Sequence, residues 1–315
     1  AENPGIVIQV KDKHKEEVKK ILEDAGIGYV KLGKPTEERH ILVEKGDATY
    51  QFGIDYLRDV WYSTSYLLDR KQSMNGCAKK RFENYKKQPL EFVFDKSFTG
   101  KLSQFDLNPD RRTPTGIKAA IIREKGTNGE REMAYMLYLA GFDVKDVTMT
   151  DLVSGRETLE DINFIVFCGG FSNSDVLDSA KGWAGAFLFN PKAKAALDNF
   201  YARKDTLSLG VCNGCQLMIE LNLINPDFTQ KAKMLHNDSH KFESKFVGVT
   251  VPMNRSVMFG SLSGSKLGIW VAHGEGKFSL PYHEDKYNVV LKYSYDEYPG
   301  NPNGSDYSVA GLASP

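Results

Sequence analysis

Short apolar strands alternate with helices between residues 115 and 211, and this alternation limits the possible folds more than any other feature of the sequence. Hydrophobic periodicity predicts, in chain order, a strand at Lys118–Arg123, a helix at Gly129–Ala140, strands at Phe142–Val147 and Asn163–Cys168, helices at 175–190 and 191–203, and a strand at Thr206–Val211. Strands that are separated by helices usually form a parallel sheet with helices on both faces. We therefore expect an α/β fold with a mostly parallel sheet.

Three loops that follow predicted strands contain unusual residues. They are EKGTNGER (124–131), CGGFSNSD (168–175) and GVCNGCQ (210–216). Functional sites of such sheets form beyond the carboxyl ends of the strands. These loops are therefore predicted to meet in one crevice.

The segment Gly210-Val211-Cys212-Asn213-Gly214 has the G-x-nucleophile-x-G form of a sharp strand-to-helix elbow. Glycines stand on both sides because the turn brings backbone against backbone, where a Cβ would clash. A thiol at a helix N-terminus is expected to favour the thiolate. The amide of Asn213 and a second donor from the loop Gly169-Gly170-Phe171 are predicted to stabilise an oxyanion. The pattern predicts that Cys212 is a nucleophile.

Other interpretations of the cysteines are weaker. Cys212-x-x-Cys215 has the spacing of a redox motif, but no aromatic-flanked Gly-Pro pair accompanies it. With His236 and His240 the spacing suggests a zinc site, but the intervening segment is longer than zinc fingers use. Cys168 and Cys215 are expected to be small buried thiols.

Residues 1–55 are predicted to be part of a larger unit. They contain an expected strand at Ile6–Val10, a helix at Lys13–Ala25, and strands at Tyr29–Leu32 and His40–Glu44. About fifty residues of this kind make a marginal domain, so we expect the other half to be missing. A helix at Tyr56–Arg70 and a linker over 88–116 would form a connector, residues 56–116.

Composition argues against several classes of partner. Lys plus Arg and Asp plus Glu both total 41, so no net field attracts nucleic acid or an anionic membrane. The basic stretch 69–87 is interpreted as a solvated helix and linker face, because it lacks an aromatic stacking platform. Neither a membrane span nor a signal peptide is recognisable, and four cysteines are too sparse for a disulfide scaffold. We expect a cytoplasmic protein with reduced thiols, and neither nucleic acid nor membrane as a partner.

Several motifs carry a resemblance to a known family: IIREKGTNGEREM, CGGFSNSDVL, GWAGAFLFNP, LGVCNGCQ, HGEGKF and NPNGS. From about Lys118 to its last residue the sequence resembles the flavodoxin-like class I glutamine amidotransferase domain of the large single-chain phosphoribosylformylglycinamidine synthases. The segment LRDVWYSTSYLLDR is similar to the end of that family's synthetase region and its connector. The resemblance implies an incomplete AIR-synthase-like α+β segment at 1–55, a connector at 56–116 and an amidotransferase domain at 117–315 that lacks its C-terminal end.

The resemblance also implies a reaction of purine biosynthesis. A cysteine thiolate attacks the side-chain amide of glutamine, ammonia leaves, and the glutamyl thioester is hydrolysed. The ammonia passes to the synthetase part of the polypeptide, where ATP and Mg activate formylglycinamide ribonucleotide. This chain is expected to need no cofactor of its own and to have glutamine and the missing synthetase part as partners. The family's roles fall on Cys212 (nucleophile), Gly170 and Asn213 (backbone oxyanion donors), and Gln216, Phe171, His273 and Gly274 (glutamine pocket).

The sequence departs from the family in one respect. The family's catalytic His and Glu lie in a P-H-P-E motif, whereas this sequence stops at AGLASP, so we expect a fragment that turns over glutamine poorly. His273 and Glu275 imitate the His-x-Glu spacing and are an alternative base and orienter. His236, His240 and His283 are expected to be surface or structural histidines. A silent fragment that only binds glutamine or its own polypeptide, or a Cys-dependent hydrolase or chaperone of the same fold, are the other functions considered.

Overall fold

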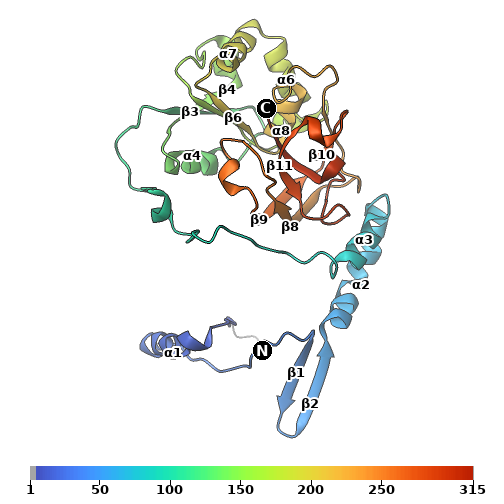
Figure 1. The fold of residues 1–315 in the computed structure, drawn as a ribbon. Helices are drawn as coiled ribbons and strands as arrows, with labels where there is room; N and C mark the ends of the chain where they lie inside the picture. Colours follow the sequence, from blue (N-terminus) through green and yellow to red (C-terminus); the bar gives the residue numbers. More distant parts are fainter. Residues whose placement is uncertain (1–4, 315) are drawn as a thin grey trace. The chain divides into compact units, whose positions relative to one another are not determined.

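A computed structural model of the chain describes residues 5–314, which divide into two compact units. One unit ends at Trp61 and the other begins at Tyr62, so the division falls within the helix α2 (Ile54–Gln72). Figure 1 shows the succession of helices and strands in both units.

The N-terminal unit contains a helix and a hairpin. A 3-10 turn, η1 (Asp12–His14), leads into α1 (Lys15–Asp24), and β1 (His40–Lys45) pairs antiparallel with β2 (Ala48–Gly53). The helix and the first hairpin strand are confirmed, while the strands predicted at Ile6–Val10 and Tyr29–Leu32 are wrong. Both segments lack a partner strand among the described residues, and an unpaired extended backbone is not a strand. No residue from 5 to 61 is buried, so this unit has no core of its own.

A parallel sheet is the centre of the C-terminal unit (Figure 1). Its order is β4-β3-β5-β6 and every pair is parallel, which confirms the predicted fold class. The strands are β3 (Lys118–Arg123), β4 (Asp143–Thr148), β5 (Phe164–Phe167) and β6 (Leu207–Gly210). The helices are α4 (Glu130–Leu139), α5 (Met149–Ser154), α6 (Lys181–Leu188), α7 (Pro191–Ala202) and α8 (Asn213–Glu220). The sequence prediction did not include α5.

The two faces of this sheet carry separate apolar clusters. Ile122 and Phe167 pack with α5, α6, α7 and α8, whereas Ile121 and Val166 pack with α4 on the opposite face. Neighbouring residues of one strand point to opposite faces, so a sheet covered on both sides needs apolar residues at nearly every position. This explains why the continuous apolar runs predicted these strands.

A second, antiparallel sheet was not predicted. Its order is β12-β11-β8-β9, and it consists of β8 (Glu243–Thr250), β9 (Lys266–His273), β11 (Asn288–Tyr293) and β12 (Val309–Ala313). Two short strands, β7 (Lys233–Leu235) and β10 (Lys277–Ser279), form a separate antiparallel pair. The remaining 3-10 turns are η2 (Leu102–Phe105), η3 (Ser172–Asp175), η4 (Gly260–Leu262), η5 (Glu284–Lys286) and η6 (Asp306–Ser308). Ile219 of α8 packs with Phe278 and Val309, so this part of the chain covers the helix that follows β6.

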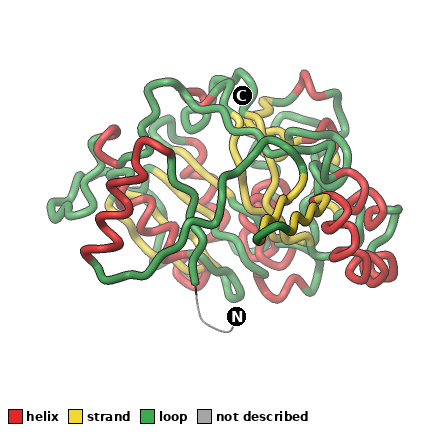
Figure 2. Tube along the Cα trace, turned by 90° about the horizontal axis from the view of Figure 1, so that it is seen from below, coloured by secondary structure: helices red, strands yellow, loops and turns green. Residues whose placement is uncertain are grey.

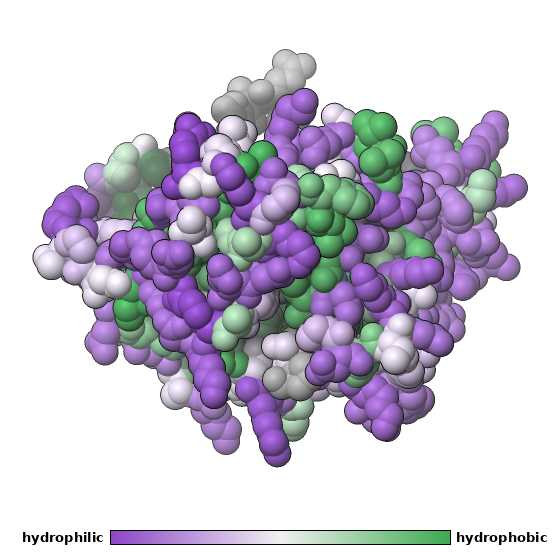
Figure 3. Space-filling view, turned by 90° about the horizontal axis from the view of Figure 1, so that it is seen from above, coloured by the Kyte–Doolittle hydropathy of each residue, from purple (hydrophilic) through white to green (hydrophobic). Residues whose placement is uncertain are grey.

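Figure 2 shows loops and turns, in green, running between the helices and strands of the chain. Residues 88–116 are mostly loop (Figure 1). Val93 nevertheless forms an antiparallel bridge with Lys266, which adds this loop to the edge of β9. The face drawn in Figure 3 is mostly hydrophilic, with hydrophobic side chains scattered over it. No helix among residues 5–314 is long and apolar enough to cross a membrane.

The basic stretch 69–87 is only partly a solvated face. It contains α3 (Cys77–Asn84), on which Cys77, Ala78 and Asn84 are buried. The guanidinium of Arg81 lies 2.7 Å from Asp69 and 3.2 Å from Glu243, whose side chain is 1% exposed. A buried carboxylate needs a charged partner. The prediction of a solvated helix is therefore wrong for this arginine, which connects α3 to the start of β8.

Candidate active site

The candidate nucleophile occupies the strained elbow that the sequence predicts. Cys212 stands between β6 and α8 with φ of 53°, in the left-handed region that non-glycine residues rarely adopt. A Cβ on Gly214 would lie 2.0 Å from the carbonyl oxygen of Phe167, and one on Gly210 would lie 2.5 Å from the carbonyl oxygen of Gly214. Both glycines are therefore required by close backbone contacts.

Two backbone amides point at the thiol. The N–H groups of Gly170 and Asn213, one from the loop after β5 and the other from the first residue of α8, both act to lower the pKa of the Cys212 thiol. Sγ also lies 3.9 Å from the carbonyl oxygen of Ala272, a weak contact. The two amides that the sequence predicts as oxyanion donors thus converge on the nucleophilic atom.

The Cys212 thiol is not activated by its surroundings in this structure. Burial raises its pKa and is the largest influence, the two backbone N–H groups lower it, and the carboxylate of Asp175 raises it further. The net effect is a raised pKa, so the expectation of a favoured thiolate is wrong. Two N–H dipoles do not compensate for removing the sulfur from water. No hydrogen bond from a histidine ring to Sγ is present among residues 5–314.

The loop after β5 is supported by the loop after β3. Gly170 has φ of 125°, and a Cβ there would lie 2.6 Å from the carbonyl oxygen of Gly126. The N–H of Phe171 donates to Gly126 O over 2.9 Å, and the N–H of Asn128 donates to Gly169 O over 2.9 Å. With Cys212 beside Gly170, the predicted meeting of the three loops is confirmed.

Behind the thiol, the side chains of Asn213 and Gln216 connect several segments. Asn213 has no solvent exposure; its Oδ1 accepts from the N–H of Ser172 over 3.0 Å, and its Nδ2 donates to Asp175 over 3.2 Å and to Gln216 over 2.9 Å. The Nε2 of Gln216 donates to the carbonyl oxygen of Glu275 over 2.8 Å. The amide of Gln216 is thus engaged inside the protein. Sequence reasoning missed the side chain of Asn213, although its position directly after the nucleophile was a usable signal.

The alternative pair His273 and Glu275 is not assembled. The ring of His273 packs so closely on Gly276 that a Cβ there would lie 2.0 Å from it, and burial lowers the pKa of the imidazole to about 4. Glu275 instead accepts from the N–H of Ser179 over 3.1 Å and lies 3.6 Å from Nδ1 of His236. Within the described residues, His273 and Glu275 therefore do not form a base and its orienter.

The other predicted pocket residues lie around this region. Phe171 directly follows Gly170; its side chain is 52% exposed and its ring centroid lies 6.2 Å from that of Phe242. The carbonyl oxygen of Gly274 accepts from the N–H of Asn237 over 2.9 Å. Phe171 is therefore available at the surface beside the elbow, whereas Gly274 helps to fix the turn after β9.

Of the remaining cysteines, Cys77 and Cys168 are buried, whereas Cys215, which was expected to be buried, is only partly so. Burial raises the pKa of Cys168 to about 11 and that of Cys215 to about 12, and the four cysteines are free. The spacing of Cys212, Cys215, His236 and His240 suggested a zinc site, but within the described residues these four side chains do not come together as metal ligands. The group that could bind a metal within the described residues is instead Asp178, His236 and Glu275, whose ligand atoms lie within 4.8 Å of one another. Lys181 pairs with Asp178 over 2.6 Å, so the charge of this group is already partly neutralised.

His236, His240 and His283 are exposed, as expected for surface histidines. The rings of His236 and His240 lie 6.3 Å apart, and Nδ1 of His283 lies 3.1 Å from Asp285. None of these rings contacts Cys212 in the described part of the chain.

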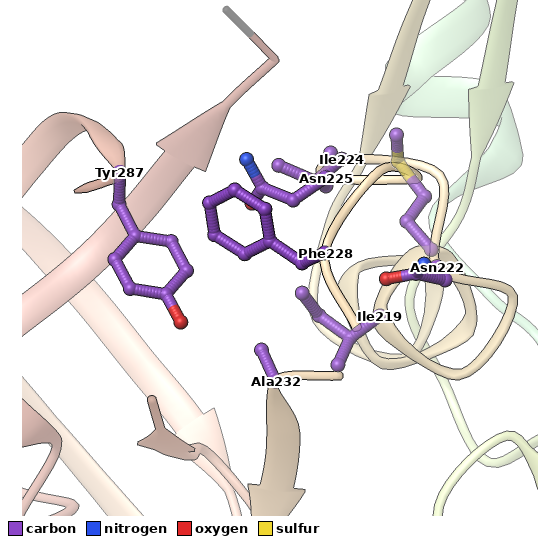
Figure 4. Close-up of a pocket in the computed structure, with 8 residues that line it drawn as sticks. Ile219, Asn222, Ile224, Asn225, Phe228, Ala232 and Tyr287 are labelled. Carbon is purple, nitrogen blue, oxygen red and sulfur yellow. The ribbon is translucent and has the colours of Figure 1, made fainter. Parts of the chain in front are cut away.

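The cavity in Figure 4 is separate from the elbow. It lies near the carboxyl end of α8, holds about 10 Å³, and is lined by Met218, Ile219, Asn222, Ile224, Asn225, Phe228, Ala232 and Tyr287. A space of this size admits a single water molecule. The Nδ2 of Asn225 is buried there without a partner, which suits a water but not a substrate.

Comparisons with known proteins identify the family of this chain. Residues 116–315 match the family model described as a CobB/CobQ-like glutamine amidotransferase domain. The chain is 36% identical over 341 residues to a probable phosphoribosylformylglycinamidine synthase, chloroplastic/mitochondrial, of Arabidopsis thaliana, and 36% identical over 349 residues to the phosphoribosylformylglycinamidine synthase of Homo sapiens. These alignments cover all of this chain but only 24% and 25% of the relatives, so the chain spans about a quarter of their length. A solved structure of PurLQS from Thermotoga maritima aligns with a TM-score of 0.49 and 28% identity, over 63% of this chain and 82% of that one.

Proposed function

We propose, from the premise that this chain belongs to the family of CobB/CobQ-like glutamine amidotransferase domains, that Cys212 attacks the side-chain amide of glutamine and releases ammonia. The observation that carries the proposal is the strained elbow at Cys212, where a Cβ on Gly169 would lie 3.3 Å from the Cys212 Cβ and the N–H groups of Gly170 and Asn213 act to lower the pKa of the thiol. Amides aimed at one point beside a nucleophile are the donors that acyl transfer requires.

The proposed reaction has two steps. The sulfur of Cys212 bonds to the side-chain carbonyl carbon, and the carbonyl oxygen takes up negative charge between the N–H groups of Gly170 and Asn213. The carbon–nitrogen bond then breaks, the proton that the thiol has lost is delivered to the leaving nitrogen, and ammonia departs, which gives a glutamyl thioester. Water adds to the thioester, the carbon–sulfur bond breaks, and glutamate and the free thiol are released.

Proton transfer is the weak part of this site. Both steps need a group that accepts and returns a proton. Among the described residues, the hydrogen bond of Sγ is to the Ala272 carbonyl and none is to an imidazole, and burial raises the pKa of the thiol. We therefore expect slow turnover by residues 1–315 alone, with imidazole added to the buffer increasing the rate.

The proposed glutamine pocket is formed by the segments around Cys212. Phe171 and the turn at His273 and Gly274 are proposed as its walls, and Gln216 as its floor. Because the Gln216 amide is bonded to Asn213 and to the carbonyl of Glu275, its proposed role is to hold these segments rather than to bind the substrate directly. The carboxylate of Asp175 beside the thiol suits a substrate that carries an ammonium group.

The longer protein is proposed to be a phosphoribosylformylglycinamidine synthase, like the relatives that this chain matches. In it, ammonia from Cys212 would pass to a synthetase part that converts formylglycinamide ribonucleotide with ATP and Mg. The surroundings of the elbow do not fit a triphosphate, because the carboxylates of Asp175 and Glu275 lie near each other there and repel phosphate. The reaction proposed for this chain therefore involves neither ATP nor Mg. We propose the cytoplasm as the location of the protein.

The test is active-site labelling with the chloromethyl ketone analogue of glutamine, followed by mass mapping. We expect one adduct on Cys212, slowed by added glutamine and lost in Cys212→Ser. Cys215→Ser is the matched control, since that thiol is on the same helix but has its pKa raised to about 12, and it should label normally. An adduct on Cys215 or Cys168, or no protection by glutamine, would contradict the proposal. Labelling by iodoacetamide but not by the analogue would favour a different substrate.

A further inference from the structure

The carboxamide of Asn213 has a single workable orientation. Its Oδ1 faces the N–H of Ser172, while its Nδ2 faces a carboxylate oxygen of Asp175 and the Oε1 of Gln216. Turning the amide over would place two donors against each other and an oxygen against the Asp175 carboxylate. All donors of this fully buried group are therefore used, and each is bonded to a different residue.

One of these bonds fixes the loop that supplies the first oxyanion donor. Ser172 is two residues after Gly170, and bonds to the loop 124–128 hold this loop from the other side. Just beyond Ser172 the backbone is strained, because Asn173 and Ser174 have φ of 53° and 58°. Such conformations persist only where the surroundings hold them. The bond from Ser172 to Asn213 is a contact that ties this loop directly to the nucleophile elbow.

We propose that the side chain of Asn213 is a positioning residue that sets the distance between the Gly170 N–H and the Cys212 sulfur. This inference rests on the proposed glutaminase reaction. The backbone of Asn213 supplies one oxyanion donor and its side chain holds the loop that supplies the other, so one residue determines both halves of the oxyanion site. Its bond to Gln216 extends the same support to Glu275 and the turn after β9.

Removal of this side chain should affect reaction more than binding. Loss of one oxyanion donor typically slows acyl transfer by about 10²-fold to 10³-fold. Asn213→Ala would displace the loop that carries the Gly170 N–H but would not remove this donor, so the expected loss of rate lies at the lower end of this range. For Asn213→Ala we therefore expect the maximal rate of labelling by the chloromethyl ketone analogue of glutamine to fall about 100-fold. The analogue concentration at half-maximal rate should change by less than about threefold, because Asn213 does not line the pocket.

The experiment compares Asn213→Ala and the isosteric Asn213→Asp with Asn225→Ala in the 315-residue chain. Asn225 is a matched control, since it is 8% exposed but lines the separate cavity of Figure 4. Iodoacetamide, which needs no oxyanion site, reports the reactivity of the thiol itself. Asn213→Asp keeps the acceptor for Ser172 but places an oxygen against the Asp175 carboxylate, so it is combined with Asp175→Asn. In that background it should retain more of the maximal rate than Asn213→Ala, and this pair tests the inference if Asn213→Ala alone folds poorly.

The outcomes separate this inference from the proposed function. A selective loss of maximal rate with the analogue, together with an unchanged iodoacetamide rate, supports it. An analogue rate equal to that of the unmodified chain overturns it, and so does an equal slowing with both reagents, which would indicate a merely structural role. If the unmodified chain reacts with iodoacetamide but not with the analogue, the proposed function is overturned, and this inference with it.

Discussion

Gly214→Ala tests the close packing at the nucleophile elbow. A Cβ at this position would lie 2.0 Å from the carbonyl oxygen of Phe167 and 2.7 Å from its Cβ. The oxygen belongs to the last residue of β5 and accepts the N–H of Val211 over 3.1 Å. It cannot swing away as the end of a flexible side chain would. The start of α8 and the end of β5 must therefore separate by roughly 1.5 Å, the difference between this contact and an ordinary van der Waals contact.

The cost follows from three contributions. Overpacking of a well-packed site typically costs about 1–3 kcal/mol, and a clash with backbone belongs at the upper end. Loss of the hydrogen bond at Phe167 adds about 1 kcal/mol. Alanine is better than glycine in a helix by about 1 kcal/mol, which offsets that loss. We expect a net destabilisation of about 3 kcal/mol, which corresponds to a fall in melting temperature of about 6–12 °C for a domain of this size.

Urea unfolding followed by circular dichroism measures this change. Gly260→Ala is the control, because a Cβ there would have its nearest contact at 3.7 Å from Asn254 O and the glycine does not need a positive φ. It should remain within about 0.5 kcal/mol of the unmodified chain. Gly214→Ala should also lose labelling of Cys212 by the chloromethyl ketone analogue. A Gly214→Ala chain as stable as the control would refute the reasoning from backbone contact.

Three further predictions use the charges of the structure. Because burial raises the pKa of Cys212 above the ordinary thiol value of 9.0, its iodoacetamide rate should still be rising at pH 9, and a plateau below pH 8 would contradict this. Arg81→Ala should destabilise the fold by about 3 kcal/mol in urea, since it leaves Asp69 and Glu243 without their shared guanidinium; a change below about 1 kcal/mol would mean that the neighbouring lysines suffice. His273 has its pKa lowered from 6.5 to about 4, so only the unfolded chain binds this proton between those pH values. Stability should therefore fall by about 3 kcal/mol as the pH drops through this window, and His273→Gln should remove that part of the pH dependence.

The parallel sheet could be predicted because its physical cause is local. A strand buried on both faces must be apolar at nearly every position, and β3 was predicted with its observed limits, Lys118–Arg123. The antiparallel sheet lacks this signal. Its strand β8 begins at Glu243, which is buried only because Arg81 and Lys245 reach it from elsewhere. A charged residue at a buried position argues against a strand until its partners are known.

The elbow could also be predicted, whereas its electrostatics could not. The glycine spacing has a steric cause that can be recognised in five consecutive residues, which explains why the strained turn at Cys212 could be predicted. The engagement of Gln216 depends on the carbonyl of Glu275, 59 residues away. The pKa of the Cys212 thiol depends on how deeply the sulfur is buried and on which amides face it. Neither this burial nor the contact of Gln216 with Glu275 can be recognised from a short motif.

The raised pKa of Cys212 is compatible with the proposed catalytic role because the same amides face a weak acceptor first and a charged acceptor later. In the resting site the N–H groups of Gly170 and Asn213 act on a sulfur whose pKa burial raises. During attack the thiol gives up its proton and negative charge develops on the carbonyl oxygen of the substrate, which is a better hydrogen-bond acceptor than a thiol. The donors then gain more than they did in the resting state, and only interactions that strengthen in this way accelerate the reaction. A buried, neutral thiol between two fixed donors therefore places the stabilisation on the tetrahedral species rather than on the free enzyme.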